Sequence, residues 1–257
     1  MTKNINWKNT DGAIWRAKKG HLRAVKEIDT VALNDLVGID VQKAVLLENT
    51  RRFLKGLPAN NVLLWGSRGS GKSSLIKAVM NHYKSKGLRI IEIDKDNLDD
   101  LVDISDVIRD ENYRFVIFCD DLSFEEGDRS YKGLKRIMEG SIEAPPNNVI
   151  IYATSNRRHL VPEYMSDNIG TKVGNKGEIH YSDSVEEKIS LSDRFGLWLS
   201  FYTGDEEQYL KVVDSYFKDY KGEKELLHQE ALDFARSRAS KSARTAKQFY
   251  NSFFKKD

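Results

Sequence analysis

The chain has 257 residues, of which 40% are hydrophobic and 31% are charged, and its formal net charge is +2. This length suits one large α/β domain with a small appendage, and the composition excludes a largely disordered chain. The small net charge favours neither nucleic acid nor a membrane surface as a general partner.

The chain carries a single cysteine, Cys119, and its polar N-terminus lacks the apolar core of a signal peptide. A lone thiol cannot form an intrachain disulfide, which suits a reducing compartment. No run approaches the roughly 18–20 apolar residues of a membrane span. The histidines show no spacing typical of a zinc site. We therefore expect a cytoplasmic protein with no membrane partner.

Residues 1–30 are predicted to form a polar, basic N-terminal arm. Within it, Leu22, Val25 and Ile28 show a weak helical spacing. Such an arm could pack on the body of its own chain or on a neighbouring subunit, and the sequence leaves both arrangements open.

Strands and helices are predicted to alternate through the next segment, residues 31–203. The predicted strands are residues 61–66, 88–94, 114–121, 147–156 and 197–202, and the predicted helices are residues 40–56, 72–86, 97–110 and 129–139. Residues 157–190 are rich in Gly, Ser, Asn and charge, so we expect an irregular insertion there. This alternation predicts a parallel α/β domain.

Helical patterns alone follow Gly204. Apolar residues recur at helical spacing in residues 209–217, 227–235 and 246–253. Residues 204–257 are therefore predicted to form a small helical lid domain.

Residues 66–73, GSRGSGKS, match the phosphate-binding pattern G-x-x-x-x-G-K-[ST], known as Walker A. Glycines permit the tight turn that aims main-chain N–H groups at phosphate oxygens, and the helix N-terminus that follows favours an anion. Lys72 is expected to reach the β- and γ-phosphates of ATP, and Ser73 to coordinate Mg²⁺. The residues expected to contact the nucleotide are Gly66, Ser67, Arg68, Gly69, Ser70, Gly71, Lys72, Ser73 and Ser74. The alternative is a glycine turn without a ligand.

Two carboxylates, Asp120 and Asp121, end the third predicted strand. An acidic residue at a strand tip beside the phosphate loop can hold Mg²⁺, which is the role expected of Asp120. Asp121 is expected to orient or deprotonate the attacking water, with Glu125 and Glu126 as nearby substitutes. The alternative is a solvated strand-to-loop turn.

Three further polar residues are candidates for sensing phosphate. Asn156 follows the fourth predicted strand, where an amide can hold water or the γ-phosphate, although Asn also favours turns. Arg194 could stabilise charge on a transferred phosphoryl group from a neighbouring subunit, or form a surface salt bridge. Arg244 lies in the first turn of the last helix, where a cation opposes the helix dipole. It is expected to reach nucleotide phosphate, or alternatively to form a basic surface patch.

Six stretches of the sequence resemble AAA+ ATPases, and in particular a bacterial AAA+ family of unknown function. They are LVGID (36–40), LLWGSRGSGKSS (63–74), FCDDLSFEEGD (118–128), IYATSNRRHLVPE (151–163), EEKISLSDRFGLWLSFY (186–202) and ARTAKQF (243–249). The similarity runs from about Leu33 to Phe249, nearly the whole chain.

The resemblance implies a three-layer αβα P-loop fold, a five-stranded parallel sheet in the order 5-1-4-3-2, and a C-terminal helical lid. The residue roles that it implies are the Walker A lysine for Lys72, the Walker B pair for Asp120 and Asp121, sensor 1 for Asn156, the arginine finger for Arg194 and sensor 2 for Arg244. Such domains commonly assemble as rings, often hexamers, with ATP at subunit interfaces. The chain departs from the family at Asp121, where Glu is usual, and at Lys241 and Ala243, where Arg and Gly are expected.

The sequence thus predicts a homo-oligomeric ATPase that hydrolyses ATP to ADP and drives a conformational change in an unknown protein partner. A nucleotide-gated binding module with slow or incidental hydrolysis is the alternative, which Asp121 keeps open. A nucleic-acid loader is less favoured because the net charge is near neutral. A small-molecule kinase is less favoured because no acceptor-pocket motif is evident.

Overall fold

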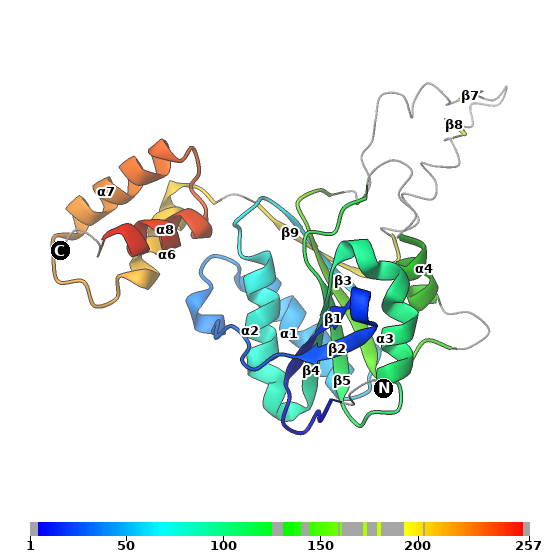
Figure 1. Ribbon diagram of the computed structural model, residues 1–257. Helices are drawn as coiled ribbons and strands as arrows, with labels where there is room; N and C mark the ends of the chain where they lie inside the picture. Colours follow the sequence, from blue (N-terminus) through cyan, green and yellow to red (C-terminus); the bar gives the residue numbers. More distant parts are fainter. Residues whose placement is uncertain are drawn as a thin grey trace.

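A mostly parallel β-sheet with helices on both faces forms the body of the protein, a Rossmann-like α/β arrangement (Figure 1). The structure, a computed structural model, describes residues 5–124, 131–139, 144–158, 160, 172–173, 179–180, 193–202 and 204–253.

Seven strands form the sheet, in the order β2-β1-β4-β5-β6-β3-β9. They are β1 (Gly12–Arg16), β2 (His21–Ala24), β3 (Val62–Gly66), β4 (Leu88–Ile93), β5 (Arg114–Cys119), β6 (Val149–Ser155) and β9 (Leu197–Phe201). β2 runs antiparallel to β1, and every other neighbouring pair is parallel. The prediction of a five-stranded sheet is therefore wrong. The five predicted strands are neighbours, in the order β9-β3-β6-β5-β4, but two N-terminal strands extend the sheet beyond β4.

Helices cover both faces of this sheet. α1 (Asp40–Leu54) and α2 (Lys72–Tyr83) lie on one face, and α3 (Leu101–Ile108) and α4 (Tyr131–Glu139) lie on the other (Figure 1). The predicted helix at residues 97–110 is divided into a 3₁₀ segment, η4 (Lys95–Asp100), and α3. Within η4, Asn97 has non-helical dihedral angles, so this segment is kinked before α3 begins.

The sheet separates two hydrophobic cores. In β5, Phe115 and Ile117 face the core under α3 and α4, whereas Val116 and Phe118 face the core under α1 and α2. Successive side chains of a strand point to opposite faces, so a strand that is apolar throughout fills both layers.

The N-terminal segment packs on the body of its own chain. Residues 21–24 form β2 instead of the weak helix expected through Leu22. β2 pairs with β1, which in turn pairs with β4, and this pairing buries Leu22 beside its cross-strand partner Trp15. Trp7 is buried, and its ring contacts Phe115 edge to face at 4.9 Å between centroids.

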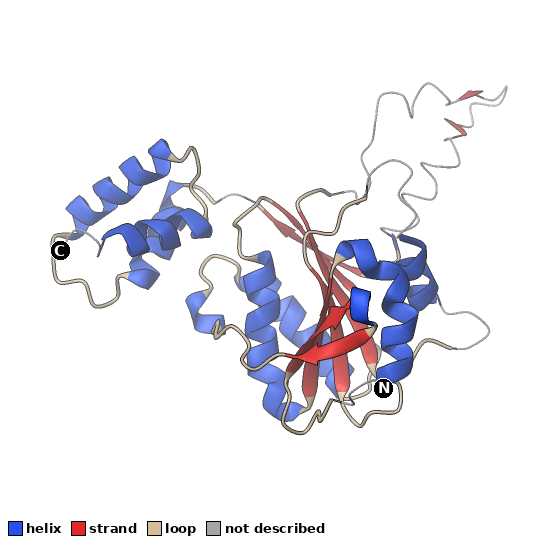
Figure 2. Cartoon of the chain, in the orientation of Figure 1, coloured by secondary structure: helices blue, strands red, loops and turns tan. Residues whose placement is uncertain are grey.

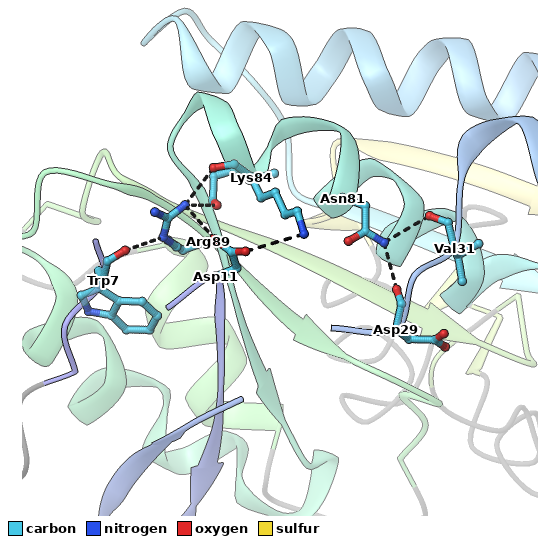
Figure 3. Close-up of polar contacts among 8 residues, drawn as sticks. Trp7, Asp11, Asp29, Val31, Asn81, Lys84 and Arg89 are labelled. Atoms are coloured by element: carbon cyan, nitrogen blue, oxygen red, sulfur yellow. Dashed lines mark hydrogen bonds and ion pairs between the residues drawn. The ribbon is translucent and has the colours of Figure 1, made fainter. Parts of the chain in front are cut away.

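Arg89 anchors this segment from β4 (Figure 3). Its side chain is buried, and Nε donates to the carbonyl of Trp7 at 2.9 Å while one terminal nitrogen donates to the carbonyl of Lys84 at 2.9 Å. Asp11 lies 3.7 Å from both Arg89 and Lys84. The carboxylate supplies the opposite charge that a buried guanidinium needs.

Beyond β9, the described residues form three helices joined by loops, as Figure 2 shows. They are α6 (Glu206–Tyr216), α7 (Lys224–Ser237) and α8 (Ala243–Phe253). Their inner faces form a third hydrophobic cluster, which includes Tyr209, Val213 and Phe249. These three helices are called the lid below.

Most of the predicted insertion at residues 157–190 lies outside the described residues. Within it, β7 (Lys172–Val173) and β8 (Ile179–His180) form a separate antiparallel pair. None of the helices in the described part of the chain has both the length and the apolar composition needed to cross a bilayer.

Candidate functional site

The turn between β3 and α2 is built around glycines in left-handed or related conformations. The φ angles are +128° at Gly66, +72° at Gly69 and +99° at Gly71, which caps α2. Residues with side chains rarely adopt positive φ, so the glycines permit this turn. At Gly66 space is also limiting, because a Cβ would lie 1.9 Å from the carbonyl oxygen of Phe201 in β9.

Replacing Gly66 with alanine is expected to lower the free energy of unfolding by about 2–4 kcal/mol, since backbone strain and a collision with β9 add together. Urea denaturation measures this loss. Gly87→Ala is the control, because Gly87 has φ +91° but no atom within 4 Å of its Cβ position. Only backbone strain, about 1–2 kcal/mol, is expected there. Equal losses for the two variants would contradict the collision with Phe201.

Lys72 folds back over the turn that precedes it. Its side chain is 7% exposed, and Nζ donates to the carbonyls of Gly66 and Ser67 at 2.8 Å and to Oδ1 of Asn156 at 3.2 Å. Burial lowers the pKa of the Lys72 ammonium, although the charges of Asp120 and Asp121 act in the opposite direction. The two carboxylates therefore do not fully offset the cost of burying the Lys72 charge, and an anion bound beside it would reduce that cost.

Asp120 joins three elements at the carboxyl edge of the sheet. Ser73, in the first turn of α2, donates its hydroxyl to Oδ1 of Asp120 at 2.7 Å. The hydroxyl of Thr154, at the end of β6, donates to the same oxygen. The predicted metal ligands Ser73 and Asp120, 47 residues apart in sequence, are thus in direct contact.

Asp121 and Asn156 form the adjoining part of the site. The Asn156 amide nitrogen donates to the carboxylate of Asp121, while its oxygen accepts from Lys72. The main-chain N–H of Asp121 donates to Oγ1 of Thr154 at 3.0 Å. Asp121 has φ +53°, a conformation that Asp and Asn tolerate better than other non-glycine residues. Thr154 was not predicted, although it lies only two residues before Asn156 at the end of the same strand.

These groups form one end of a cleft of about 730 Å³ between the body and the lid. The described lining residues at the charged end include Arg68, Lys72, Ser73, Ser74, Asp120, Asp121, Asn156, Arg244 and Lys247. Six apolar residues also line the cleft, and they are called the apolar wall below: Val31, Leu36, Val37 and Ile39 before α1, and Val212 and Tyr216 from α6. Asp29 and Asp35 of the same segment and Lys77 of α2 line the cleft beside them. The sequence did not predict this apolar wall, because its two parts are far apart in the chain.

Polar contacts hold the segment before α1 in place. The Asn81 amide in α2 donates to the carbonyls of Asp29 at 2.9 Å and Val31 at 3.1 Å (Figure 3). From the lid, Gln208 donates to the carbonyl of Gly38 at 3.1 Å. The apolar wall is therefore tied to both α2 and the lid.

The structure brings Arg244 to the cleft but not Arg194. Arg244, in the first turn of α8, lies against the glycine turn between β3 and α2. A Cβ placed on Gly69 would be 3.2 Å from the Cβ of Arg244. Arg194 instead forms an ion pair with Glu139 at the end of α4, and it does not line the cleft within this chain. Glu125 and Glu126, the suggested substitutes for Asp121, lie outside the described residues.

The donor set fits a phosphate-bound Mg²⁺ better than a metal held by protein alone. Across the described residues, no group of three or more His, Cys, Asp or Glu side chains could hold a metal ion. Mg²⁺ commonly takes one or two protein oxygens and completes its coordination with phosphate oxygens and water. Ser73 and Asp120 supply such a pair beside a turn that is suited to phosphate.

One family model, described as a protein of unknown function (DUF815), matches residues 8–256. A comparison with curated proteins finds no match.

Proposed function

The chain belongs to the DUF815 family, and we propose from its site that it is a P-loop ATPase of the AAA+ type, which binds ATP with Mg²⁺ and uses hydrolysis to drive a conformational change. The contact between Ser73 and Asp120 carries this proposal. Two side chains expected to share one Mg²⁺ are already hydrogen-bonded at 2.7 Å, at the start of a helix that follows a glycine turn.

Each group in the cleft has a distinct role in this proposal. The main-chain N–H groups of residues 67–73 bind phosphate oxygens, with help from the helix N-terminus. Lys72 turns from the carbonyls of the turn toward the β- and γ-phosphates. When bound, Mg²⁺ neutralises charge that develops on the phosphate oxygens.

Asn156 and Asp121 hold and orient the attacking water. The amide of Asn156 contacts both Lys72 and Asp121, so it can link the phosphate-binding lysine to the base. A carboxylate accepts a proton or orients water when it lies within hydrogen-bond reach of it. Thr154 supports this pair, because it donates to Asp120 and accepts from the main chain of Asp121.

The apolar wall of the cleft accommodates the adenine base. It combines the segment before α1 with Val212 and Tyr216 of the lid. A ligand bound there contacts body and lid together, so a change at the phosphate end can alter how the lid sits. Arg244 reaches the phosphates from the lid and acts as the sensor 2 residue.

The proposed AAA+ assignment includes the three-layer core, with β9-β3-β6-β5-β4 as its five core strands, and assembly into a homo-oligomeric ring. In such a ring, Arg194 would act on the nucleotide of a neighbouring subunit. Its ion pair with Glu139 would then have to open, since the side chain is only 15% exposed. Mass measurement in solution, with and without ATP and Mg²⁺, tests assembly.

The direct test of the proposal is equilibrium binding of ATP to the full chain, measured by calorimetry with and without Mg²⁺, followed by phosphate release. ATP is expected to bind more tightly in the presence of Mg²⁺, because Ser73 and Asp120 would hold the metal and its charge would offset that of the phosphates. Absence of binding to any adenine or guanine nucleotide would refute the proposal.

A nucleotide-gated binding module remains the second candidate, and Asp121 favours it. Its side chain is one methylene shorter than the glutamate usual at this position in AAA+ proteins. Its left-handed backbone would accept Glu less readily than Asp. In this candidate function, ATP binding alone sets the lid position, and hydrolysis is incidental.

Replacing Asp121 with asparagine distinguishes these two functions. Asparagine also tolerates the left-handed conformation, so the backbone should persist. We expect ATP affinity within twofold of the wild type and phosphate release lowered about a hundredfold, since a general base typically contributes 10²–10⁴-fold. Single-turnover phosphate release measures this effect, with the exposed Asp110→Asn variant as control. A wild-type rate no higher than that of Lys72→Ala would favour the binding module.

A further inference from the structure

The hairpin of β1 and β2 has one apolar face and one cationic face. Arg16 pairs with His21 and Ile14 with Arg23 across the two strands, so Arg16, His21 and Arg23 project from the same side. Trp15 and Leu22 project from the opposite side, into the core. Lys18 and Lys19 lie in the connecting turn, η1 (Ala17–Lys19).

Among the described residues, no carboxylate forms an ion pair with the basic side chains of this hairpin. Arg16, Lys18, Lys19 and Arg23 are exposed, and none forms an ion pair within the described part of the chain. Basic residues elsewhere commonly have one, as in the pairs Lys43–Asp40, Arg51–Glu48, Lys77–Asp29, Lys211–Glu207 and Lys241–Glu206. Grouped like charges repel one another, so this arrangement favours an anionic ligand.

The cationic face forms a wall of a second cleft, of about 960 Å³. The end of β4 and the residues after it also line this cleft, with Glu92 beside Ile14 on the same face of the sheet, followed by Asp94 and Lys95. Asp120 and Asp121 line this cleft and also the cleft between the body and the lid. Because β1 is parallel to β4, the hairpin turn lies at the carboxyl edge of the sheet, where α/β folds bind their ligands.

The hairpin is held firmly in this position. Nε1 of Trp15 donates to Oδ2 of Asp100 at 2.7 Å, and Arg89 fixes the segment that precedes β1. Charges on an edge strand can simply prevent edge-to-edge aggregation. Only β2 is at the edge, however, whereas Arg16 belongs to β1, which is paired on both sides. Edge protection therefore does not account for the whole cationic face.

We propose that the cationic hairpin cleft binds an acidic, extended segment of a partner protein. Two features favour a peptide over a nucleic acid. Glu92 and Asp94, which line the same cleft, would repel a uniformly charged phosphate backbone, whereas a peptide can present carboxylates to Arg16 and Arg23 and neutral groups to Glu92 and Asp94. The cleft also offers little for base stacking, since Trp15 is 8% exposed and its N–H is already engaged.

The bound segment would lie beside Asp120 and Asp121, the carboxylates assigned above to Mg²⁺ and water. Its binding does not depend on the ATPase proposal, although it would explain how a partner reaches the hydrolysis site.

Fluorescence anisotropy with the full chain tests this proposal in nucleotide-free buffer. The probe is a labelled twelve-residue peptide of alternating Glu and Thr, compared with its Lys/Thr counterpart and with an oligothymidine of equal charge. We expect the acidic peptide to bind most tightly. The Arg16→Ser/Arg23→Ser variant should bind it about fivefold more weakly, as expected for the loss of two exposed charge pairs.

The matched control is Lys55→Ser/Lys221→Ser, which removes the same charge from exposed positions outside the cleft and should change the affinity less than twofold. If the hairpin variant unfolds, Lys18→Ser/Lys19→Ser in the turn tests the same face. Equal binding by hairpin and control variants would overturn the proposal, and so would tighter binding of the oligothymidine. Because no nucleotide is present, failure here is separate from failure of ATP binding.

Discussion

Replacing Lys72 with alanine is expected to weaken ATP binding in the presence of Mg²⁺ at least a hundredfold and to abolish measurable phosphate release. Lys72 provides the buried cation of the turn, and charge-assisted contacts to phosphate in a site shielded from water are among the strongest that a side chain makes. Removing one such donor from a site of this kind typically costs about 10²–10³ in rate.

Folding should be affected far less than function by this substitution. Burial lowers the pKa of Lys72, which means that the folded chain disfavours its charged form, and alanine removes that penalty. The substitution also removes the donors to Gly66 and Ser67, so the two effects on stability oppose each other. Calorimetry, phosphate release and urea denaturation measure the three quantities. Lys86→Ala, at an exposed position, is the control. Unchanged ATP affinity in a folded Lys72→Ala variant would eliminate the proposed phosphate site.

Replacing Asp120 with asparagine is expected to lower Mg²⁺-dependent phosphate release about 10²–10³-fold while leaving ATP binding without Mg²⁺ unchanged or tighter. Asparagine keeps an oxygen that can accept from Ser73 and Thr154, so the local structure can persist. The negative charge of Asp120, which asparagine lacks, attracts the metal in the wild type. The same charge repels the phosphates when no metal is present.

A titration of the turnover rate with Mg²⁺ measures this effect. Asp110→Asn, at an exposed position, removes the same charge and should behave as the wild type. The Lys72 and Asp120 variants therefore differ in kind, because the first loses the nucleotide and the second loses only the response to metal. An unaltered Mg²⁺ requirement in the Asp120 variant would show that the metal is held elsewhere.

The phosphate turn was predictable because it is local. Residues 66–73 are contiguous, and the conformations of Gly66 and Gly71 follow from their own lack of a side chain. The proximity of Asp120 and Asn156 to this turn was predictable for a different reason. Parallel strands end at one edge of a sheet, so residues that follow β3, β5 and β6 meet there.

The two N-terminal strands were not predictable in the same way. β1 and β2 are short: Ala13, Ile14 and Trp15 are consecutive apolar residues in β1, and β2 has only Leu22 and Ala24, so neither shows the sustained alternation typical of a half-buried strand. A strand of this kind gains stability from its neighbours, here from β4 and from the anchoring of Arg89, and propensity alone does not reveal them. The same holds for Thr154, whose hydroxyl has a role only because Asp120 lies opposite.

The sequence by itself determined the alternation of strands and helices, the glycine turn and the chemistry at the strand ends, because periodicity and backbone freedom are properties of neighbouring residues. Only the tertiary structure decided that the sheet has seven strands, that Arg194 pairs with Glu139, and that the lid completes an apolar wall with the segment before α1. Those outcomes depend on contacts between residues far apart in the chain. Such contacts form only when folding has brought these residues together in three dimensions.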